Sequence, residues 1–329
     1  MTTFNLYRLT FSSPLHISDA REDYGSSEKL LHSDSMYAAL IASLAKVGAL
    51  HGIAETGDLG CTISSLFPYT KAANQFVYFF PKPFLPFNDE GKDMSSFSKK
   101  LKKVKWIDKN YFEKVINNTP AKIENDATML KGSYMTDAAI DPQFSYSQTV
   151  PRISVPRSAE ENKGDTKIFY MERMYFNSDS GLYFLASGDT KNLESALNVL
   201  QYEGIGTDRT VGQGFFSFEK DKMELSCPVS ATHSCSLSLF CPEQKSSLQS
   251  MIDDQSRWEI IKRGGWISTD AMLGIRKKSV YMFTEGSVFK TSNQTEGKVN
   301  LNLTPTAEGL KVDHKIWRSG RSIFLPVIA

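Results

Sequence analysis

The sequence predicts an α+β protein with two domains. Short segments rich in β-branched and aromatic residues alternate along the chain with segments whose apolar residues recur every three or four positions, the patterns of strands and amphipathic helices. The length of 329 residues is sufficient for two domains, each with its own hydrophobic core. Hydrophobic residues make up 40% of the chain and charged residues 23%, a composition typical of folded globular proteins.

Two main helices are predicted in the first domain, residues 1–222. One lies within residues 30–50, where Ser33, Asp34 or Ser35 is expected to cap its start. The other covers residues 189–203. Their apolar faces are Tyr37, Leu40, Leu44 and Val47 in the first helix, and Leu193, Leu197 and Leu200 in the second.

Five strands accompany these helices. We predict them at residues 4–11, 76–81, 166–176, 181–187 and 215–219. The second ends at its first proline, because proline cannot donate a ladder hydrogen bond, and residues 166–187 are expected to form a β-hairpin. With residues 84–166 treated as an insertion, the order of elements is that of a ferredoxin-like (RRM-like) βαββαβ unit.

The insertion and the second domain are less regular. We predict a helix in two pieces between residues 97 and 116, with Asp108 capping the second piece, and a long loop or projecting hairpin over residues 117–166. Residues 223–329 repeat the first pattern loosely, as a modified ferredoxin-like domain. Its predicted elements are strands at 234–241, 257–263, 278–284, 298–303 and 323–328, and a helix at 243–252.

Cysteine usage and the termini indicate an intracellular protein. The chain has four cysteines without the paired spacing of a zinc site, too few for a disulfide scaffold, so we predict no metal and a cytoplasmic location. The first residues do not resemble a signal peptide, and no apolar stretch is long enough to span a membrane, so no membrane partner is expected.

Charge is nearly balanced overall but segregated along the chain. The 38 basic and 37 acidic residues give a net charge of +1, which by itself argues against nucleic acid. However, residues 99–105 contain five lysines and no acid, and residues 257–278 and 311–321 are also strongly basic. A basic groove on a neutral protein is therefore possible, although a single run such as 99–105 is more often a solvated face.

A glycine-rich segment is the sharpest local motif. Gly204, Gly206, Gly212 and Gly214 lie between the second helix and the last strand of the first domain, together with Arg209. We expect glycine N–H groups to face a phosphate, with Arg209 as a charged clamp. Neither a Rossmann fingerprint nor a P-loop fits, because the loop runs from helix to strand and no Gly-Lys-Ser/Thr closes it. A flexible connection is the alternative.

Two further groups of residues are candidates for RNA contact. His32, Ser33 and Ser35 lie at a predicted helix start, where unpaired N–H groups attract anions, but Asp34 could occupy the same position. Arg152 and Arg157 lie in the projecting segment, either as RNA contacts or as ordinary surface arginines.

Several segments together resemble the RAMP superfamily of CRISPR proteins. They are LLHSDSMYAALIASL, FFPKPFLP, KKLKKVKWI, GIGTDRTVGQGFFSF, VYMFTEGSVF and HKIWRSGRSIFLPV, and they are most similar to the fourth Csm subunits of type III-A effector complexes. The resemblance covers most of the chain and is weakest in residues 84–96 and 117–166. Where this family has a basic residue directly after the second glycine of the loop, this chain has Thr207, Asp208 and then Arg209.

The resemblance implies a non-catalytic, RNA-binding subunit without cofactors that acts in antiviral defence. Such subunits hold the crRNA 5′ handle, contact the large polymerase-like Csm subunit and a backbone RAMP Csm subunit, and meet target RNA only indirectly. It assigns RNA contact to the glycine-rich loop with Arg209, to His32, Ser33 and Ser35, and to the hairpin that carries Arg152 and Arg157.

Two other functions are weighed against this prediction. His16 and His32 could form the acid/base pair of a metal-independent, crRNA-processing endoribonuclease of the same superfamily. The glycine-rich loop could instead hold a mononucleotide in an enzyme.

Overall fold

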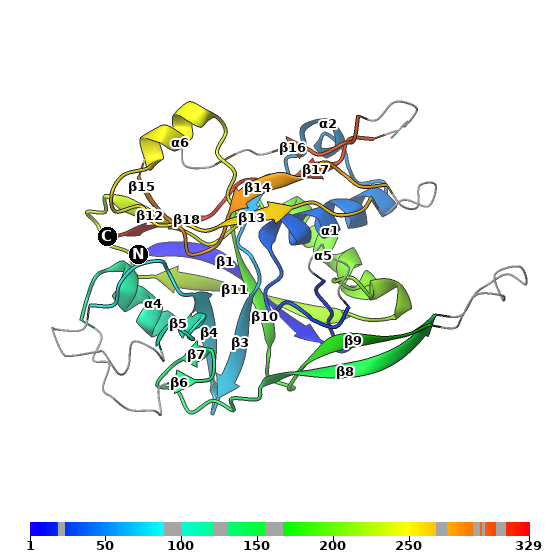
Figure 1. The fold of residues 1–329 in the computed structure, drawn as a ribbon, viewed down its shortest axis with the longest axis horizontal. Coiled ribbons are helices and arrows are strands. Elements are labelled where there is room, and N and C mark those ends of the chain that lie inside the picture. Colours follow the sequence, from blue (N-terminus) through cyan, green and yellow to red (C-terminus); the bar gives the residue numbers. More distant parts are fainter. Residues whose placement is uncertain are drawn as a thin grey trace, which may run out of the picture.

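A mixed sheet of nine strands forms the centre of the computed structural model (Figure 1). The structure describes residues 1–18, 24–88, 101–120, 130–154, 167–267, 275–291, 297, 300–306 and 314–329. The sheet order is β11 (Phe216–Leu225), β1 (Thr2–Phe11), β10 (Gly181–Gly188), β3 (Phe67–Ala72), β4 (Gln75–Pro81), β5 (Trp106–Asp108), β7 (Tyr134–Met135) and β6 (Leu130–Lys131), while β2 (Cys61–Ile63) pairs with β10 outside this path. All neighbours are antiparallel except β5 and β7.

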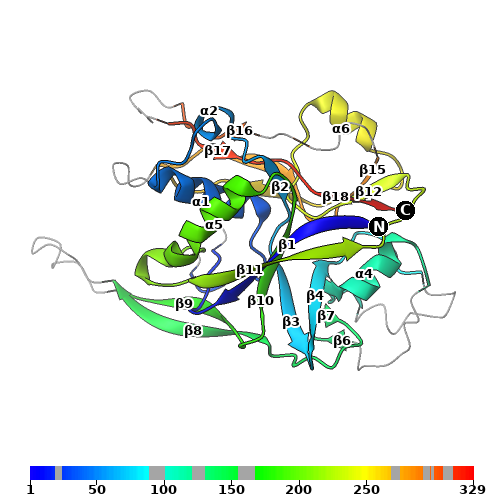
Figure 2. The same ribbon diagram turned by 180° about the vertical axis from the view of Figure 1, so that it is seen from behind.

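Alternation along β1 divides the core into two layers. Tyr7 and Leu9 face α1 (Ser33–Lys46) and α5 (Lys191–Glu203), and they pack with Leu40 of α1 and Leu197 of α5 (Figure 2). Phe4, Leu6 and Arg8 point to the opposite face, because successive side chains of a strand alternate. The two faces of one strand therefore serve two different environments.

The second layer of the core joins residues from both predicted domains. Phe4 and Leu6 belong to the same buried cluster as Phe112 of α4 (Lys109–Ile116), and Cys235 and Leu325 of the C-terminal part complete it. Cys235 lies in β12 (His233–Ser236), which pairs with β15 (Val288–Lys290) and β18 (Phe324–Val327). The two parts of the chain thus share a hydrophobic core.

The remaining described elements are small or project from the body. A long hairpin of β8 (Ser145–Ser154) and β9 (Lys167–Phe176) extends away from the central sheet (Figure 1). The C-terminal part adds the pairs β13 (Ile260–Arg263) with β14 (Val280–Phe283) and β16 (Leu301–Asn302) with β17 (Trp317–Arg318), and the helix α6 (Lys245–Met251). Two single turns, α2 (Ile53–Thr56) and the 3₁₀ turn η2 (Arg209–Val211), complete the set. Among the described residues, no helix is long and apolar enough to cross a membrane.

Several predicted elements are confirmed. The strand that ends at Pro81 and the two main helices are present, and Asp108 caps α4 by accepting a hydrogen bond from the Tyr111 N–H at 2.9 Å. The predicted projection over residues 117–166 contains β8, one strand of the hairpin. The observed protein is sheet-rich with few helices, whereas two ferredoxin-like domains, 1–222 and 223–329, stay a prediction. β11 runs to Leu225, three residues beyond the predicted boundary.

Other predictions are wrong for identifiable reasons. Residues 166–187 do not form a hairpin, because β9 pairs with β8 whereas β10 enters the central sheet beside β1. Residues 106–108 are strand rather than helix. β2 and β3 were not predicted. β3 contains Pro68, which cannot donate a hydrogen bond to a neighbouring strand, so its sequence is not typical of a strand within a sheet. Val47 is 55% exposed, because the helix ends before it.

Candidate nucleic-acid interface

The segment Pro14 to Ser18 connects the glycine-rich loop to the start of α1. The Gly214 N–H donates to the Pro14 carbonyl at 2.8 Å, and the Thr207 N–H donates to the His16 carbonyl at 2.9 Å. In return, the Ser18 N–H donates to Thr207 Oγ1 at 3.1 Å. Ser18 also lines a small pocket with His32 and Ser35 of the helix start. Two motifs that are separated by about 170 residues in sequence therefore lie on one surface.

The glycines serve close backbone packing rather than an open cradle. A Cβ atom at Gly214 would lie 1.9 Å from the Ile205 carbonyl oxygen, and one at Gly206 would lie 2.5 Å from that of His16. The N–H groups of Gly204, Gly212 and Gly214 donate to Leu200, Arg209 and Pro14 carbonyls. The prediction that glycine N–H groups are available to a phosphate is therefore wrong for these three glycines, because the folded loop uses them internally.

Side chains, not backbone groups, supply the charge at this loop. Asp208 accepts a hydrogen bond from Arg152 of β8, with Nη1 and Oδ2 3.1 Å apart, and Nη2 of Arg173 in β9 lies 3.8 Å from the same oxygen. Arg209 follows Asp208 and opens η2. Two arginines thus flank one carboxylate where the hairpin meets the loop, and a third, Arg209, follows that acid in sequence. Arg157 lies outside the described residues.

The start of α1 is organised around a fully buried carboxylate. Asp34 is 0% exposed and receives Nε and Nη2 of Arg263 at 3.0 Å each, as well as Nη1 of Arg318. These arginines lie 229 and 284 residues away in sequence. Because two guanidinium groups outweigh the effect of burial, the pKa of Asp34 lies well below its usual value. The expectation that Ser33, Asp34 or Ser35 caps the helix is wrong: the N-cap is His32, without a side-chain hydrogen bond.

The other predicted residues of the helix start are also held by internal contacts. Ser35 Oγ accepts from Arg263 Nη2 at 2.8 Å, and Ser33 Oγ accepts from the Leu239 N–H at 3.1 Å. His32 Nδ1 lies 2.8 Å from Oε1 of Glu285, which also accepts from the Ser65 hydroxyl. Burial alone would lower the pKa of His32, but the Glu285 carboxylate raises it above 6.5. Glu285, although buried, has its pKa lowered by His32 and Ser65.

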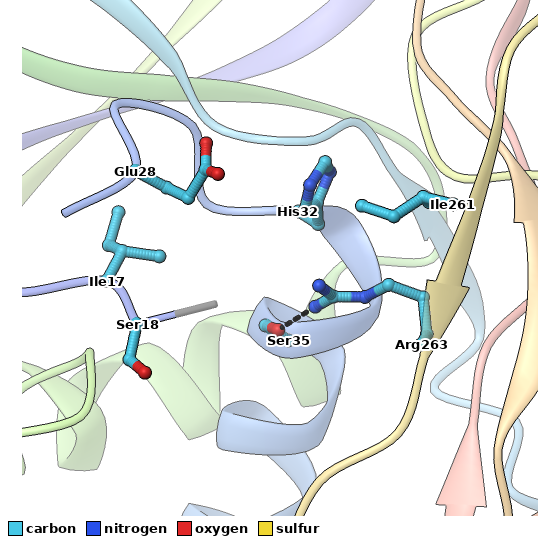
Figure 3. Close-up of a pocket in the computed structure, with 7 residues that line it drawn as sticks. All are labelled: Ile17, Ser18, Glu28, His32, Ser35, Ile261 and Arg263. Atoms are coloured by element: carbon cyan, nitrogen blue, oxygen red, sulfur yellow. Dashed lines mark hydrogen bonds between the residues drawn. The ribbon is translucent and has the colours of Figure 1, made fainter. Parts of the chain in front are cut away.

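The pocket beside these residues is small and polar on several sides (Figure 3). Ser35 and Arg263 form one wall, and Glu28 and Ser18 come from the facing segments. Lys277 adds a third cation near Asp34, and burial together with Arg318 and Arg263 lowers the pKa of Lys277 to about 8. Sequence reasoning did not single out Arg173, Arg263, Lys277 or Arg318. The only signal for the last three was their place in basic segments.

Of the two histidines weighed as an acid/base pair, His16 is buried and His32 is partly buried. His16 is 1% exposed, and its Nδ1 lies 2.7 Å from the Glu172 carbonyl oxygen. The Nδ1 atom of His32 is paired with the carboxylate of Glu285. Among the described residues, no group of three or more His, Cys, Asp or Glu side chains is arranged to hold a metal ion.

The opposite face of the central sheet carries a different charge pattern. Arg8 of β1 donates to Tyr78 at 2.7 Å and pairs with Asp221 and Glu219 of β11, each at 3.0 Å. The Arg8 guanidinium also lies over the Phe76 ring, 4.5 Å from its centroid. The side chains of Glu219 and Asp221 are 71% and 55% exposed, so this face presents carboxylates to solvent.

The sequence is similar to those of known proteins. Residues 230–327 match the family described as the CRISPR Csm4 C-terminal domain. The chain is 26% identical over 296 residues to the CRISPR system Cms protein Csm4 of Thermococcus onnurineus (strain NA1), covering 85% of this chain and 89% of that protein. It is 25% identical over 305 residues to the protein of the same name from Streptococcus thermophilus, covering 90% and 91%.

Solved structures match over the whole fold. A chain of the crystal structure of the Csm3-Csm4 subcomplex in the type III-A CRISPR-Cas interference complex superposes with a TM-score of 0.64 at 16% identity, covering 100% of both chains. A chain of the Csm1-Csm4 cassette in complex with cA4 gives 0.60 at 20% identity, covering 99% and 98%. The fold is therefore shared with the matched chains of these two complexes. Together with the sequence matches, it makes the chain similar to Csm4 proteins of type III CRISPR systems.

Proposed function

We propose that this chain is the non-catalytic subunit of a type III-A CRISPR effector complex that binds the crRNA 5′ handle. In that complex it bridges the large polymerase-like subunit and a backbone RAMP subunit, acts in the cytoplasm in antiviral defence, and meets target RNA only through its neighbours. The observation that carries the proposal is the contact of Arg152 with Asp208. It brings the hairpin to the glycine-rich loop, which segment 14–18 joins to the start of α1.

The charge of this surface supports RNA as the ligand. Arg152 and Arg173 lie beside a single acid, Asp208, and Arg209 follows it in sequence, so this part of the loop carries three arginines against one acid. The arginine side chains, rather than the glycine N–H groups, are the phosphate contacts that we propose. Charged hydrogen bonds from arginine suit phosphate oxygens because the planar guanidinium offers several donors in a fixed arrangement.

The predicted contacts at the helix start take a different role in this proposal. His32, Ser33 and Ser35 are engaged by Glu285, Leu239 and Arg263, so they fix the C-terminal part of the chain against α1. The remaining opening beside them is the small pocket of Figure 3. RNA that contacts this region would meet Ser35 and Arg263 at its edge.

The proposed partners correspond to the proteins in the matched structures. Those structures contain Csm1 with Csm4 and Csm3 with Csm4. We propose that the large polymerase-like subunit and the backbone RAMP subunit of this organism's complex bind this chain in the same way. We also propose that residues 1–222 and 223–329 are two ferredoxin-like domains, fixed to one another through the shared core.

Binding of handle RNA over a series of salt concentrations tests the RNA-binding proposal. The variant Arg209→Ala, measured in the full chain, should weaken binding and reduce the slope of log K against log salt by about 0.7, the value for one lost phosphate contact on a single strand. Asp208→Asn should have the opposite effect on affinity, since it removes the acid between the arginines. Lys245→Ala in α6, an exposed lysine away from the loop, is the control. Unchanged affinity and slope for both loop variants would contradict the proposal.

The non-catalytic part is tested separately. Purified protein incubated with a repeat-containing precursor RNA should leave the RNA intact. Cleavage that disappears in His16→Ala or His32→Ala would instead support the endoribonuclease alternative.

A further inference from the structure

We infer that the outer face of the β13–β14 hairpin is a second RNA contact, which binds single-stranded RNA by base stacking. This face is formed by Ile260, Lys262 and Tyr281, with Trp258 at its end. The inference rests on the proposed function, because it extends RNA contact from the first surface to the C-terminal part of the chain.

The hairpin has one buried side and one open side. In its register, Ile261 faces Met282 and Arg263 faces Val280. Ile261 and Val280 pack on the buried cluster that contains Met282, and Arg263 binds Asp34. The alternate pairs, Lys262 with Tyr281 and Ile260 with Phe283, point the other way, where Phe283 is itself buried and the other three side chains are exposed.

The open side exposes large apolar side chains. Tyr281 is 65% exposed, Ile260 55% and Trp258 39%. Trp258 is also rigidly supported, because its ring stacks on Phe289 at 12° and meets Phe283 edge-on at 89°, with both centroid distances 6.3 Å. A supported ring with an open surface loses little conformational entropy when a planar ligand stacks on it. A contiguous apolar area of this kind on a protein surface is typical of a binding site.

The charged side chains near this face indicate which kind of ligand binds there. Lys262 is exposed on this face, directly opposite Tyr281, and the exposed charged residues next to the two strands in sequence are Arg257 and Lys278 against one acid, Glu259. A ligand that covers the face should therefore be negatively charged and should offer flat, apolar rings. Single-stranded RNA has both properties, since its bases stack on aromatic side chains while its phosphates attract lysine and arginine.

The spacing of the two aromatic residues fits separate bases. The Thr284 N–H donates to the Glu259 carbonyl at 3.0 Å, so the β13–β14 register continues toward Trp258. Trp258 and Tyr281 are then four residues apart along the hairpin, or about 13 Å at the usual rise per residue. Lys262 lies directly opposite Tyr281, where it can reach the phosphate next to a base stacked on the tyrosine.

The inference is tested with the full chain and an unstructured single-stranded RNA longer than the handle, in two measurements. The first is affinity. Tyr281→Ser should weaken binding about 5- to 100-fold, since stacking on one aromatic ring contributes about 1–3 kcal/mol. Phe76→Ser is the matched control, because Phe76 is 39% exposed on the opposite face of the central sheet, where Arg8 is paired with Glu219 and Asp221. The second is ultraviolet cross-linking followed by peptide mass spectrometry, where RNA should attach to peptides that contain Trp258 or Tyr281.

The outcomes separate this inference from the proposed function. If wild type binds the RNA and Arg209→Ala weakens binding, but Tyr281→Ser and Lys262→Ala bind like wild type without cross-links at the hairpin, only the second contact is refuted. If these two variants instead lose capture of the large subunit, the face binds protein and the inference is overturned. If wild type does not bind RNA, the proposed function fails and this inference fails with it.

Discussion

Two charged clusters of this protein, built from the same residue types, have opposite arrangements. At the Arg8 cluster, a nearly buried arginine binds Glu219 and Asp221, whose side chains are 71% and 55% exposed. At the Asp34 cluster, a fully buried carboxylate binds Arg263 and Arg318, whose side chains are 14% and 6% exposed. The first cluster places its excess acids in solvent, whereas the second surrounds its single acid with bases.

In the function proposed above, the difference allows a chain with a net charge of +1 to bind RNA on one side. Exposed carboxylates at the Arg8 cluster repel phosphate, so this face of the central sheet is unfavourable for RNA. An RRM-like sheet that binds RNA would instead present aromatic residues on such a face. On the side of α1 and the glycine-rich loop, Asp34 and Asp208 each lie beside two arginines. Net charge is an average over these two sides and does not describe either one.

The largest expected effect comes from the buried acid. Asp34→Asn removes the charge that both arginines share and leaves two guanidinium groups without their counter-ion, so it should lower the free energy of unfolding by about 3–5 kcal/mol. Urea denaturation measures this loss. Asp58→Asn is the matched control, because Asp58 pairs with Arg321 at 3.4 Å but is 41% exposed, and it should cost less than about 1 kcal/mol. Equal effects for the two variants would contradict the comparison.

A smaller effect is expected at the Arg8 cluster. Arg8→Met keeps most of the packing on Phe76 and leaves Glu219 and Asp221 free to be hydrated, so the loss should be about 1–2 kcal/mol. The same denaturation measurement applies, with Lys71→Met as a control for an exposed cation near the same ring. If Arg8→Met lowered the free energy of unfolding as much as Asp34→Asn, the solvent exposure of Glu219 and Asp221 would not determine how much the loss of their partner destabilises the protein.

The smallest effect concerns pH and the pair His32–Glu285. The pKa of His32 is raised above 6.5, so the stability it contributes is complete below pH 6.5 and is lost as the pH rises through the raised value. The pKa of Glu285 is lowered below 4.5, so its contribution is lost in the opposite direction, as the pH falls through the lowered value. The difference in unfolding free energy between wild type and His32→Gln should therefore shrink at alkaline pH. A difference that is constant from pH 6 to pH 9 would show that the pair contributes no charge interaction.

Local features of the fold were predictable because their signals are local. The apolar spacing of Leu193, Leu197 and Leu200 defines α5, and Asp108 caps α4 through a side chain only three residues from its donor. β3 was missed because Pro68 contradicts the usual composition of a strand within a sheet. The partner of β9 was also missed, since strand pairing depends on which edge is available rather than on the strand's own sequence.

The candidate site shows the same limit more strongly. The glycine-rich loop was found from its composition, but its internal hydrogen bonds depend on Pro14 and His16, about 200 residues earlier. The pairing of Asp34 with Arg263 and Arg318 spans 229 and 284 residues. No periodic pattern records such a contact, so the sequence could indicate basic segments without indicating which acid they meet.

The shared core also has a consequence for synthesis of the protein. Phe4 and Leu6 are translated well before Leu325 and Val327, which belong to the same buried cluster. The apolar surface of β1 on this side therefore stays incompletely covered until residues 325–327 have been translated. During that interval it is a natural binding site for chaperones, and a prematurely terminated chain would keep it exposed and would be marked for degradation rather than assembled.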